Sequence, residues 1–349
     1  QKENVQPSPF RVVWNYPDES CQLRNIDLEL SKYGIVTNEP RTFVGNEIAT
    51  LYSSKVGLWP SFEDDNITQP INGGIPQLAN LTAHLDQLRK DIAKQIPASS
   101  TGYAVLDQEE WRTLYDLNYG MYTVYKHASV VEANNKQGSA EEEWNKSARE
   151  FMEQSLLEAR AVRPNAHWGY YLYPQTWGDA EQTRAVNDRI SWLCRASTGI
   201  YPSIYLRDMT SSEMKQRVES TLNEAIRMRA MYGQASTPIV AYTIVQADNF
   251  FSKDILDYAI GLSAEMGIDG VIIWGSSRRF KPNPAEKCNG IKKYVHDILG
   301  PYVSQLTDKF TNCSIRLCGG RGRCVRKDYA RSISRHTGSV FPDRPGSTC

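Results

Sequence analysis

Two acidic side chains follow a short apolar run in the segment YAVLDQEEWR, which extends from Tyr103 to Arg112. The apolar residues predict a buried strand, and side chains two positions apart project to the same face of a strand. We therefore expect Asp107 and Glu109 to point together beyond the carboxyl end of this strand. Neighbouring carboxylates repel, so one holds a proton at a pH where an isolated one would not. Such a pair is equipped to cleave a glycosidic bond, although a strand that simply ends in a polar loop has the same pattern.

The rest of the chain supplies the elements that would position this pair. Short runs rich in β-branched and aromatic residues predict seven strands: Arg11–Asn15, Glu47–Tyr52, Tyr103–Asp107, Trp168–Tyr173, Tyr201–Leu206, Ile239–Ile244 and Gly270–Trp274. Apolar residues recur at helical spacing in four intervening regions, 78–92, 144–162, 218–226 and 255–266. This alternation predicts an α/β fold with a parallel sheet, and a closed (β/α) barrel is favoured for a chain of 349 residues. An open doubly wound sheet is the alternative, but the chain lacks the G-x-G-x-x-G turn of its nucleotide-binding version.

Polar or aromatic residues end most of the predicted strands. They are Asn15, Tyr52, Asp107 with Glu109, Tyr171 with Tyr173, Tyr242 and Trp274. Barrels of this class carry their active sites at the carboxyl ends of the strands. Aromatic rings stack on the apolar faces of sugars, and their polar tips contact sugar hydroxyls. A single tyrosine would be interpreted as core packing, whereas this recurrence indicates a sugar-binding cleft.

Other chemistries find little support in the sequence. The five histidines are scattered, with no H-E-x-x-H spacing, and neither a G-x-S-x-G motif nor a P-loop occurs. The formal net charge is zero, which gives no reason to expect a nucleic-acid partner. No apolar run approaches the roughly 18 residues of a membrane span. We therefore expect no metal, no cofactor, no nucleic acid and no transmembrane segment.

The seven cysteines are distributed unevenly. Four of them, Cys313, Cys318, Cys324 and Cys349, crowd the end of the chain around three glycines, which favours a small disulfide-rich module. A zinc site is the rival, but it would favour Cys-x2-Cys pairs with histidine nearby. Cys194 lies in an apolar helical segment and is expected to be a buried thiol.

Four N-glycosylation sequons support secretion, as the cysteine-rich end does. They begin at Asn66, Asn80, Asn145 and Asn312. Together with the cysteine-rich end, they indicate an oxidising, extracellular compartment. The polar segment Gln1–Pro9 is expected to follow a leader that has been removed.

Between about Phe10 and Arg326 the chain resembles the animal and venom hyaluronidases, a family of endo-β-N-acetylhexosaminidases. The main match is DQEEWR from Asp107 to Arg112, which is similar to the family's D-x-E-x-W-R catalytic stretch. Further matches are FRVVWN from Phe10, LYSS from Leu51, GGIPQ from Gly73, WGYY from Trp168, YPSIY from Tyr201 and LGPY from Leu299.

The resemblance implies a fold and a set of site residues. The family fold is a distorted (β/α) TIM-like barrel of about seven strands. Glu109 would be the proton donor, and Asp107 and Tyr171 would orient and polarise the substrate's acetamido group. The expected cleft residues are Tyr52, Arg112, Gln175, Tyr242 and Trp274. The acetamido oxygen itself would attack the anomeric carbon, since two carboxylates this close in sequence cannot flank a sugar from opposite sides.

The same resemblance implies how the cysteines pair and how the chain divides. It places a Cys21–Cys288 disulfide between the two ends of the barrel, and Cys313–Cys324 and Cys318–Cys349 in an epidermal-growth-factor-like fragment. Cys194 would remain unpaired. We therefore expect a catalytic barrel over residues 1–308 and a cysteine-rich fragment over residues 309–349.

The chain departs from the family at several positions. Many members have an acidic residue and a cysteine where this chain has Gln175 and Thr176, and the loop that follows is shortened to Trp177–Ala185. Thr113 replaces a usual proline, and Ser277 replaces a second tryptophan. Gln175 removes a negative charge near the acid, which would change the pH optimum or the substrate preference.

These observations predict a secreted, lysosomal or venom endo-glycosidase that acts as a monomer on a glycosaminoglycan. Its substrate would be hyaluronan, and the sequence does not separate hyaluronan from chondroitin. The alternative is a catalytically weak glycosaminoglycan-binding protein that keeps the cleft. A chitinase-like barrel would need a D-x-x-D-x-D-x-E pattern, which the chain lacks.

Overall fold

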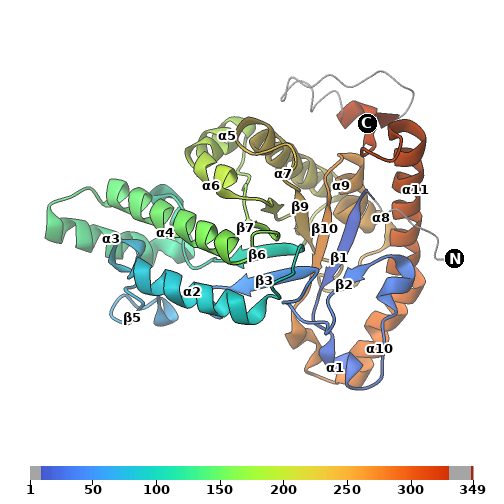
Figure 1. Ribbon diagram of the computed structural model, residues 1–349, viewed down its shortest axis with the longest axis horizontal. Coiled ribbons are helices and arrows are strands. Elements are labelled where there is room, and N and C mark those ends of the chain that lie inside the picture. Colours follow the sequence, from blue (N-terminus) through green and yellow to red (C-terminus); the bar gives the residue numbers. More distant parts are fainter. Residues whose placement is uncertain (1–8, 330–346, 349) are drawn as a thin grey trace.

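The computed structural model describes residues 9–329 and 347–348 and shows a (β/α) barrel with helices packed around it (Figure 1). Its parallel strands are β1 (Arg11–Asn15), β2 (Val36–Thr37), β3 (Ile48–Tyr52), β6 (Tyr103–Asp107), β7 (His167–Leu172), β8 (Tyr201–Pro202), β9 (Val240–Thr243) and β10 (Gly270–Trp274). All seven strands predicted from the sequence are present, and the predicted distorted barrel is confirmed. Two short antiparallel pairs lie outside it, β4 (Ser61–Phe62) with β5 (Pro70–Ile71) and β11 (Val325–Arg326) with β12 (Ser347–Thr348).

The barrel consists of two four-stranded sheets, in the orders β3-β6-β7-β8 and β2-β1-β10-β9. Two isolated parallel bridges, Ile200 with Ile239 and Ser203 with Tyr242, join β8 to β9. At the other junction between the two sheets, where β2 lies next to β3, the side chain of Asn38 takes the place of strand pairing. Its Nδ2 donates to the Ile48 carbonyl at 2.8 Å, and its Oδ1 accepts from the Ile48 amide at 3.1 Å. One buried amide side chain therefore connects β2 to β3 and closes the barrel.

The strand β8 is shorter than the predicted Tyr201–Leu206. Pro202 has no N–H to donate to a neighbouring strand, so the regular ladder is interrupted there. The chain nevertheless stays beside β9, because the Ile204 amide donates to the Tyr242 carbonyl at 2.9 Å. This irregular stretch carries Ser203 and Tyr205 to the end of the barrel.

The helices surround the barrel as the periodicity predicted. They are α1 (Glu19–Gln22), α2 (Leu81–Gln95), α3 (Thr123–Lys136), α4 (Ala140–Val162), α5 (Ala180–Arg189), α6 (Ser191–Ala196), α7 (Ser211–Tyr232), α8 (Lys253–Leu256), α9 (Leu262–Glu265), α10 (Pro284–Tyr294) and α11 (Gly300–Cys318). Single π-helical segments, Asp257–Gly261 and Val295–Leu299, connect α8 to α9 and α10 to α11. Figure 1 shows α2, α3 and α4 on one side of the barrel and α10 and α11 on the other.

Leu78 does not belong to the helix that its spacing predicted. The side chain of Asn80 caps α2 by accepting a hydrogen bond from the Ala83 amide at 3.0 Å, and the helix begins at the next residue, Leu81. Leu78 is half exposed in the turn before this cap. A local capping interaction therefore took precedence over the apolar periodicity.

The disulfide predictions are confirmed where the structure describes them. Cys21 bonds to Cys288 and joins α1 to α10 across 267 residues of sequence, and Cys313 bonds to Cys324. Cys318 is also disulfide-bonded, whereas its predicted partner, Cys349, lies outside the described residues. The predicted boundary between residues 308 and 309 falls inside α11, which runs continuously from Gly300 past Cys313 to Cys318.

Cys194 is a free, buried cysteine in α6. Burial raises the pKa of its thiol to about 11, because the charged thiolate is poorly solvated there. We expect a thiol-specific reagent to label no cysteine in the native protein and one cysteine, Cys194, after unfolding without reductant. Peptide mapping after labelling checks this result. Labelling of native Cys194 at the rate of an exposed thiol would contradict it.

Candidate active site

The predicted carboxylate pair lies at the carboxyl end of β6, between β3 and β7. Asp107 is the last residue of the strand and is 9% exposed. Its carbonyl accepts a hydrogen bond from the Ser53 amide at 2.9 Å, which continues the pairing of β6 with β3 beyond the last strand residue. Glu109 follows two residues later and is exposed at the barrel end. The strand thus presents one buried and one accessible carboxylate at the same place.

The two carboxyl groups favour a shared proton. Burial, followed by the charges of Glu109 and Glu110, raises the pKa of Asp107 to about 8. The surrounding protein also raises the pKa of Glu109 by reducing the solvation of its carboxylate, although the side chain stays accessible, and the nearby Arg112 guanidinium opposes this effect. Because the two groups interact directly, this proton belongs to the pair rather than to either residue. Near neutral pH the pair therefore holds a proton that it can donate.

Glu110 and Arg112 support the pair from either side. The Glu110 carboxylate accepts hydrogen bonds from the Ser53 hydroxyl at 2.7 Å and from the Glu109 amide at 3.2 Å. Arg112 donates to the Glu109 carbonyl at 3.3 Å, and its guanidinium lies 4.2 Å from the centroid of the Tyr122 ring. It also donates to the Tyr122 hydroxyl at 2.5 Å. Arg112 thus braces the Glu109 backbone and contributes a positive charge beside the acids.

The shared proton predicts an alkaline limit to activity. A group that must be protonated to work loses function as pH rises through its pKa, so kcat/KM should fall above about pH 8. Glu110→Gln removes a negative charge that helps to raise the pKa of Asp107. In this variant the alkaline limb of the pH profile, where kcat/KM falls, should therefore move to lower pH. Rates measured from about pH 5 to about pH 9 for both proteins check this direction. A limb that moves to higher pH in the variant would contradict it.

Tyr171 lies on β7 beside the acids and is held by two neighbours. Its hydroxyl donates to the Ser203 hydroxyl at 3.2 Å, and its ring meets the Tyr242 ring edge-on with centroids 5.0 Å apart. Burial, with smaller contributions from the charges of Glu109 and Asp107, raises the pKa of Tyr171 to about 12. The phenol therefore stays protonated and can donate a hydrogen bond near the carboxylates.

Tyr242 lies beneath Tyr171 rather than at the open mouth, since it is 1% exposed. The Thr50 hydroxyl donates its proton to Asn15 Oδ1 at 2.7 Å. The Tyr242 hydroxyl lies 2.7 Å from the Thr50 hydroxyl oxygen and is therefore the donor in that second hydrogen bond. This chain of hydrogen bonds connects β1, β3 and β9 across the inside of the barrel. In this structure Tyr242 packs against Tyr171 and fixes its ring from below.

Tyr52, Trp274 and Tyr205 form an aromatic wall next to the acids. The Trp274 indole donates to the Tyr52 hydroxyl at 2.8 Å. The Trp274 ring stacks on Tyr205, with centroids 6.0 Å apart and planes 25° apart, and Tyr205 in turn lies 6.3 Å from Tyr171. The negative charges of Asp107 and Glu109 help to raise the pKa of Tyr52, which places this wall within their field. Stacked rings with polar tips are suited to hold a sugar.

Gln175, the remaining predicted cleft residue, lies in the segment that follows β7. The Asn187 side chain on α5 donates to the Gln175 carbonyl at 2.8 Å and to Glu224 on α7 at 2.9 Å. Helices α5 and α7 therefore hold this segment at the barrel end. A role for the Gln175 side chain in binding substrate remains a prediction.

Sequence reasoning missed three residues at this site: Ser203, Tyr205 and Arg217. Ser203 and Tyr205 lie within the stretch predicted as one strand, and Tyr205 carried the same signal as the other aromatic strand ends. Arg217 gave no such signal, because it lies on α7 and reaches the site only through the fold. Its guanidinium donates to the Ser203 carbonyl at 3.2 Å and to the Thr176 hydroxyl at 3.2 Å.

The structure also places the histidines and the sequons. Over residues 9–329, no group of histidine, cysteine or acidic side chains could hold a metal ion. His84 is fully buried between α2 and α4, where it bonds the Leu58 amide and the Ser155 hydroxyl.

Among the sequon asparagines, Asn66, Asn80 and Asn312 are exposed, whereas Asn145 accepts a hydrogen bond from the Tyr115 amide at 2.8 Å. Glycosylation at these four positions remains a prediction.

Comparison with known proteins agrees with this geometry. The hyaluronidase family profile matches residues 1–339. Hyaluronidase conohyal-P1 of Conus purpurascens is 41% identical over 335 residues, which are 92% of this chain and 71% of that protein. Chondroitin hydrolase of Caenorhabditis elegans is 33% identical over 349 residues, which are 91% of this chain and 75% of that protein. The crystal structure of bee venom hyaluronidase in complex with a hyaluronic acid tetramer superposes with a TM-score of 0.79 at 31% identity, covering 85% of this chain and 99% of that one. The chain therefore belongs to the hyaluronidase family.

Proposed function

We propose that the protein is an extracellular endo-glycosidase that cleaves the β-1,4 N-acetylhexosaminide bonds of hyaluronan, with chondroitin as a second substrate. The observation that carries this proposal is the Asp107–Glu109 pair at the barrel end, with raised pKa values and an aromatic wall beside it. Two relatives support the substrate class. One is named a chondroitin hydrolase, and the bee venom enzyme was solved with a hyaluronic acid tetramer.

In this proposal Glu109 is the general acid and base. It is the accessible member of the pair, so the shared proton passes through Glu109 to the leaving sugar oxygen, and the pair is then fully ionised. After the leaving sugar departs, the same carboxylate accepts a proton from the water that completes hydrolysis. The configuration of the anomeric carbon is retained, because two successive displacements occur on it.

The nucleophile in the first displacement is the acetamido oxygen of the substrate. Asp107 and Glu109 leave the same strand end and face the same side, so the second carboxylate cannot attack from the opposite face of the sugar. A tethered nucleophile also has the effective concentration of an intramolecular reaction. The Asp107 carboxylate stabilises the positive charge that develops on the acetamido group, and the Tyr171 hydroxyl orients it by hydrogen bonding.

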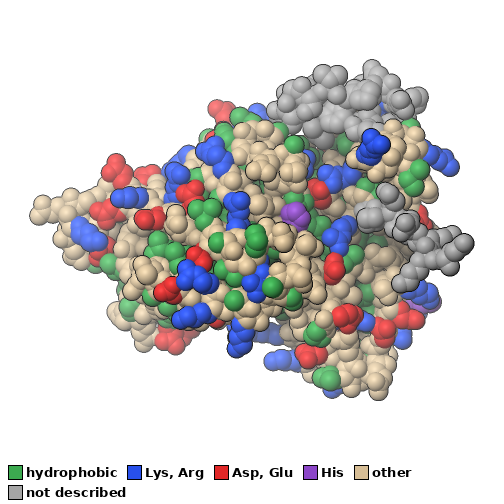
Figure 2. Space-filling view, viewed as in Figure 1, with side chains coloured by type: hydrophobic (Ala, Val, Ile, Leu, Met, Phe, Trp, Pro, Cys, Tyr) green, Lys and Arg blue, Asp and Glu red, His purple; other side chains and the backbone are tan. Residues whose placement is uncertain are grey.

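The surface charges are mixed, so an anionic polysaccharide would be recognised by groups in the cleft rather than by the overall charge of the protein. Figure 2 shows basic and acidic side chains interspersed over one face, in keeping with a net charge of zero. The bonded cysteines support an extracellular location, since disulfides persist in oxidising compartments. Within residues 9–329 and 347–348, no helix could cross a membrane.

The release of reducing ends from purified hyaluronan and chondroitin tests this proposal. We expect hydrolysis of hyaluronan, slower or comparable hydrolysis of chondroitin, and even-numbered oligosaccharides with N-acetylhexosamine at the new reducing end. Mass spectrometry of the products identifies the bond that is cut. A folded protein that binds both polymers but cleaves neither would instead establish the glycosaminoglycan-binding alternative.

A further inference from the structure

A buried asparagine holds the loop that follows the carboxylate pair. Asn118 lies between β6 and α3 and is fully buried. Its side-chain Oδ1 accepts a hydrogen bond from the Arg112 amide at 2.8 Å. Its Nδ2 donates to the Arg112 carbonyl at 3.1 Å and to the Leu114 carbonyl at 2.9 Å. A carboxamide has an acceptor oxygen and two donor hydrogens, so this one side chain bonds both backbone polar groups of Arg112.

Helix α4 holds the same loop through two further hydrogen bonds. The indole of Trp144, which is fully buried, donates to the Arg112 carbonyl at 3.1 Å. The side chain of Asn145 accepts from the Tyr115 amide at 2.8 Å. The Arg112 carbonyl therefore accepts from both Asn118 and Trp144, while its amide donates to Asn118. Buried polar groups that are satisfied in this way make the backbone rigid.

The position of this backbone determines where the Arg112 charge lies. The side chain moves with its own Cα, and the guanidinium donates to the Glu109 carbonyl at 3.3 Å and lies over the Tyr122 ring. Loss of solvation raises the pKa of Asp107 and of Glu109, and the positive charge of Arg112 opposes this effect in both. If the guanidinium were displaced, the pair would hold its shared proton to a higher pH.

The other titratable groups around the pair do not supply this effect. Glu110 is negative and acts in the opposite sense to Arg112. Arg217 lies beyond Tyr171, where it donates to the Ser203 carbonyl. The tyrosines that face the acids from neighbouring strands and loops stay neutral, because burial raises the pKa of each of them: Tyr52, Tyr122, Tyr171, Tyr205 and Tyr242. The charge that Asn118 controls is therefore that of Arg112.

We propose that Asn118 is a positioning residue for the carboxylate pair: by fixing both backbone polar groups of Arg112, it holds the guanidinium beside Glu109. In this role Asn118 acts through Arg112 and touches no substrate. The inference rests on the proposed hydrolase reaction, in which the pair must hold one proton. Its consequence is that a fully buried side chain helps to set the pH range over which the pair is active.

Replacement of Asn118 by leucine tests this role. Leucine has the same number and branching of heavy atoms but no donor or acceptor, so the Arg112 backbone loses two of its three bonds. The alkaline limb of kcat/KM should move to higher pH by about half a unit or more, because a neighbouring cation lowers the pKa of a carboxyl group by about 1–3 units. This direction is opposite to that expected for Glu110→Gln. Trp144→Phe removes only the third bond and should move the limb the same way by less.

A double-mutant cycle separates positioning from a general loss of stability. Arg112→Gln alone should move the alkaline limb to higher pH. Asn118→Leu added to that variant should move the limb no further, because the charge that it controls is already gone.

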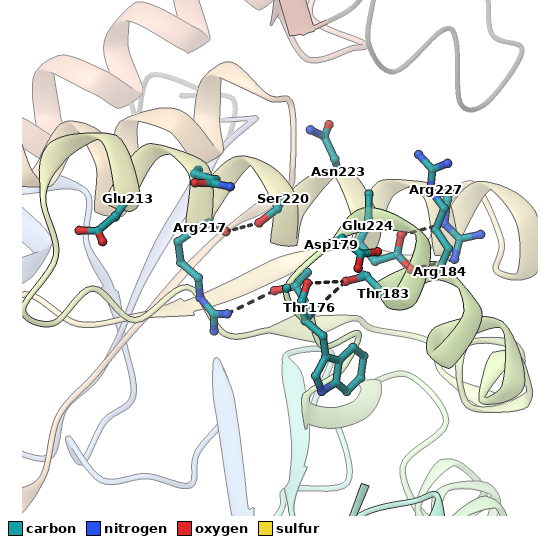
Figure 3. Close-up of a pocket in the computed structure, with 14 residues that line it drawn as sticks. Thr176, Asp179, Thr183, Arg184, Glu213, Arg217, Ser220, Asn223, Glu224 and Arg227 are labelled. Carbon is teal, nitrogen blue, oxygen red and sulfur yellow. Dashed lines mark hydrogen bonds and ion pairs between the residues drawn. The ribbon is translucent and has the colours of Figure 1, made fainter. Parts of the chain in front are cut away.

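Asn187→Leu is the matched control for loss of a buried asparagine. Asn187 is also fully buried, and its side chain donates to the Gln175 carbonyl, the Thr183 carbonyl and the Glu224 carboxylate. Glu224 keeps its partner Arg227 in this variant, since the two side chains are directed toward each other at 2.7 Å (Figure 3). The control should lower the melting temperature and leave the alkaline limb in place.

Carbon-13 NMR titration of protein labelled at its aspartate and glutamate carboxyl carbons reports the pKa of the pair without turnover. A raised pKa in Asn118→Leu supports the positioning role even if the protein cleaves neither polymer, so failure of the proposed reaction is seen separately. An unmoved titration in folded Asn118→Leu would overturn the role, as would an equal further shift in the Arg112→Gln background. If Asn118→Leu does not fold, an unmoved titration in Trp144→Phe overturns it instead.

Discussion

Replacement of Glu109 by glutamine is expected to abolish hydrolysis while the protein stays folded and still binds polysaccharide. Glutamine keeps the size and shape of the side chain but has no proton to give to the leaving oxygen. General acid catalysis is typically worth about 10²–10⁴-fold, and we expect the upper end because a sugar oxygen is a poor leaving group. Glu109 is exposed at the barrel end, and the glutamine amide can still hydrogen-bond to the buried Asp107 carboxyl.

The control for this experiment is Glu110→Gln, the same substitution one residue further along. Glu110 contacts the Ser53 hydroxyl and the Glu109 amide, and is not proposed to donate a proton. Its replacement should therefore reduce the rate far less than replacement of Glu109. Thermal melting of both variants verifies the fold. Near-normal turnover in a folded Glu109→Gln protein would remove Glu109 from the mechanism.

Asp107→Asn should reduce kcat by about 10²–10³-fold for a different reason. Its carboxylate stabilises positive charge on the acetamido group in the transition state, and asparagine offers no such charge. Because Asp107 is buried, this effect acts in surroundings where charges interact more strongly than in water. The loss should appear in kcat rather than KM, since the charge develops after binding.

An oligosaccharide with a nitrophenol leaving group distinguishes the two roles. Nitrophenolate leaves without protonation, so this substrate should restore much of the activity of Glu109→Gln. It should restore little in Asp107→Asn, because the acetamido group must still attack the anomeric carbon. Equal rescue of both variants would contradict the division of roles between the two carboxylates.

The strands could be predicted because their pattern is local. Predicted and observed bounds coincide for β1, β6 and β10, where short apolar runs end in polar or aromatic residues. The prediction failed where a single residue overrides the pattern, as at Pro202 in β8 and at the Asn80 cap of α2. The closure of the barrel by Asn38 gave no sequence signal, since an asparagine in a loop has many other uses.

The carboxylate pair was predictable for the same local reason. Glu109 lies two residues beyond the last strand residue, Asp107, and side chains two positions apart on extended backbone share a face, so both were assigned to a common site before the fold was known. The pairing of Cys21 with Cys288 came from resemblance to a family rather than from spacing, because spacing alone does not determine which cysteines meet.

The sequence by itself determined the order of strands and helices, the adjacent carboxylates and the aromatic strand ends. Only the tertiary structure decided how these groups act, because burial and long-range contact depend on how the barrel closes. It raised the pKa of Asp107 by enclosing it, stacked Trp274 on Tyr205 and placed Tyr242 beneath Tyr171. It also brought Arg217 of α7 to the Ser203 carbonyl. Each of these contacts joins residues from separate strands or helices, and no local pattern encodes which of them will meet.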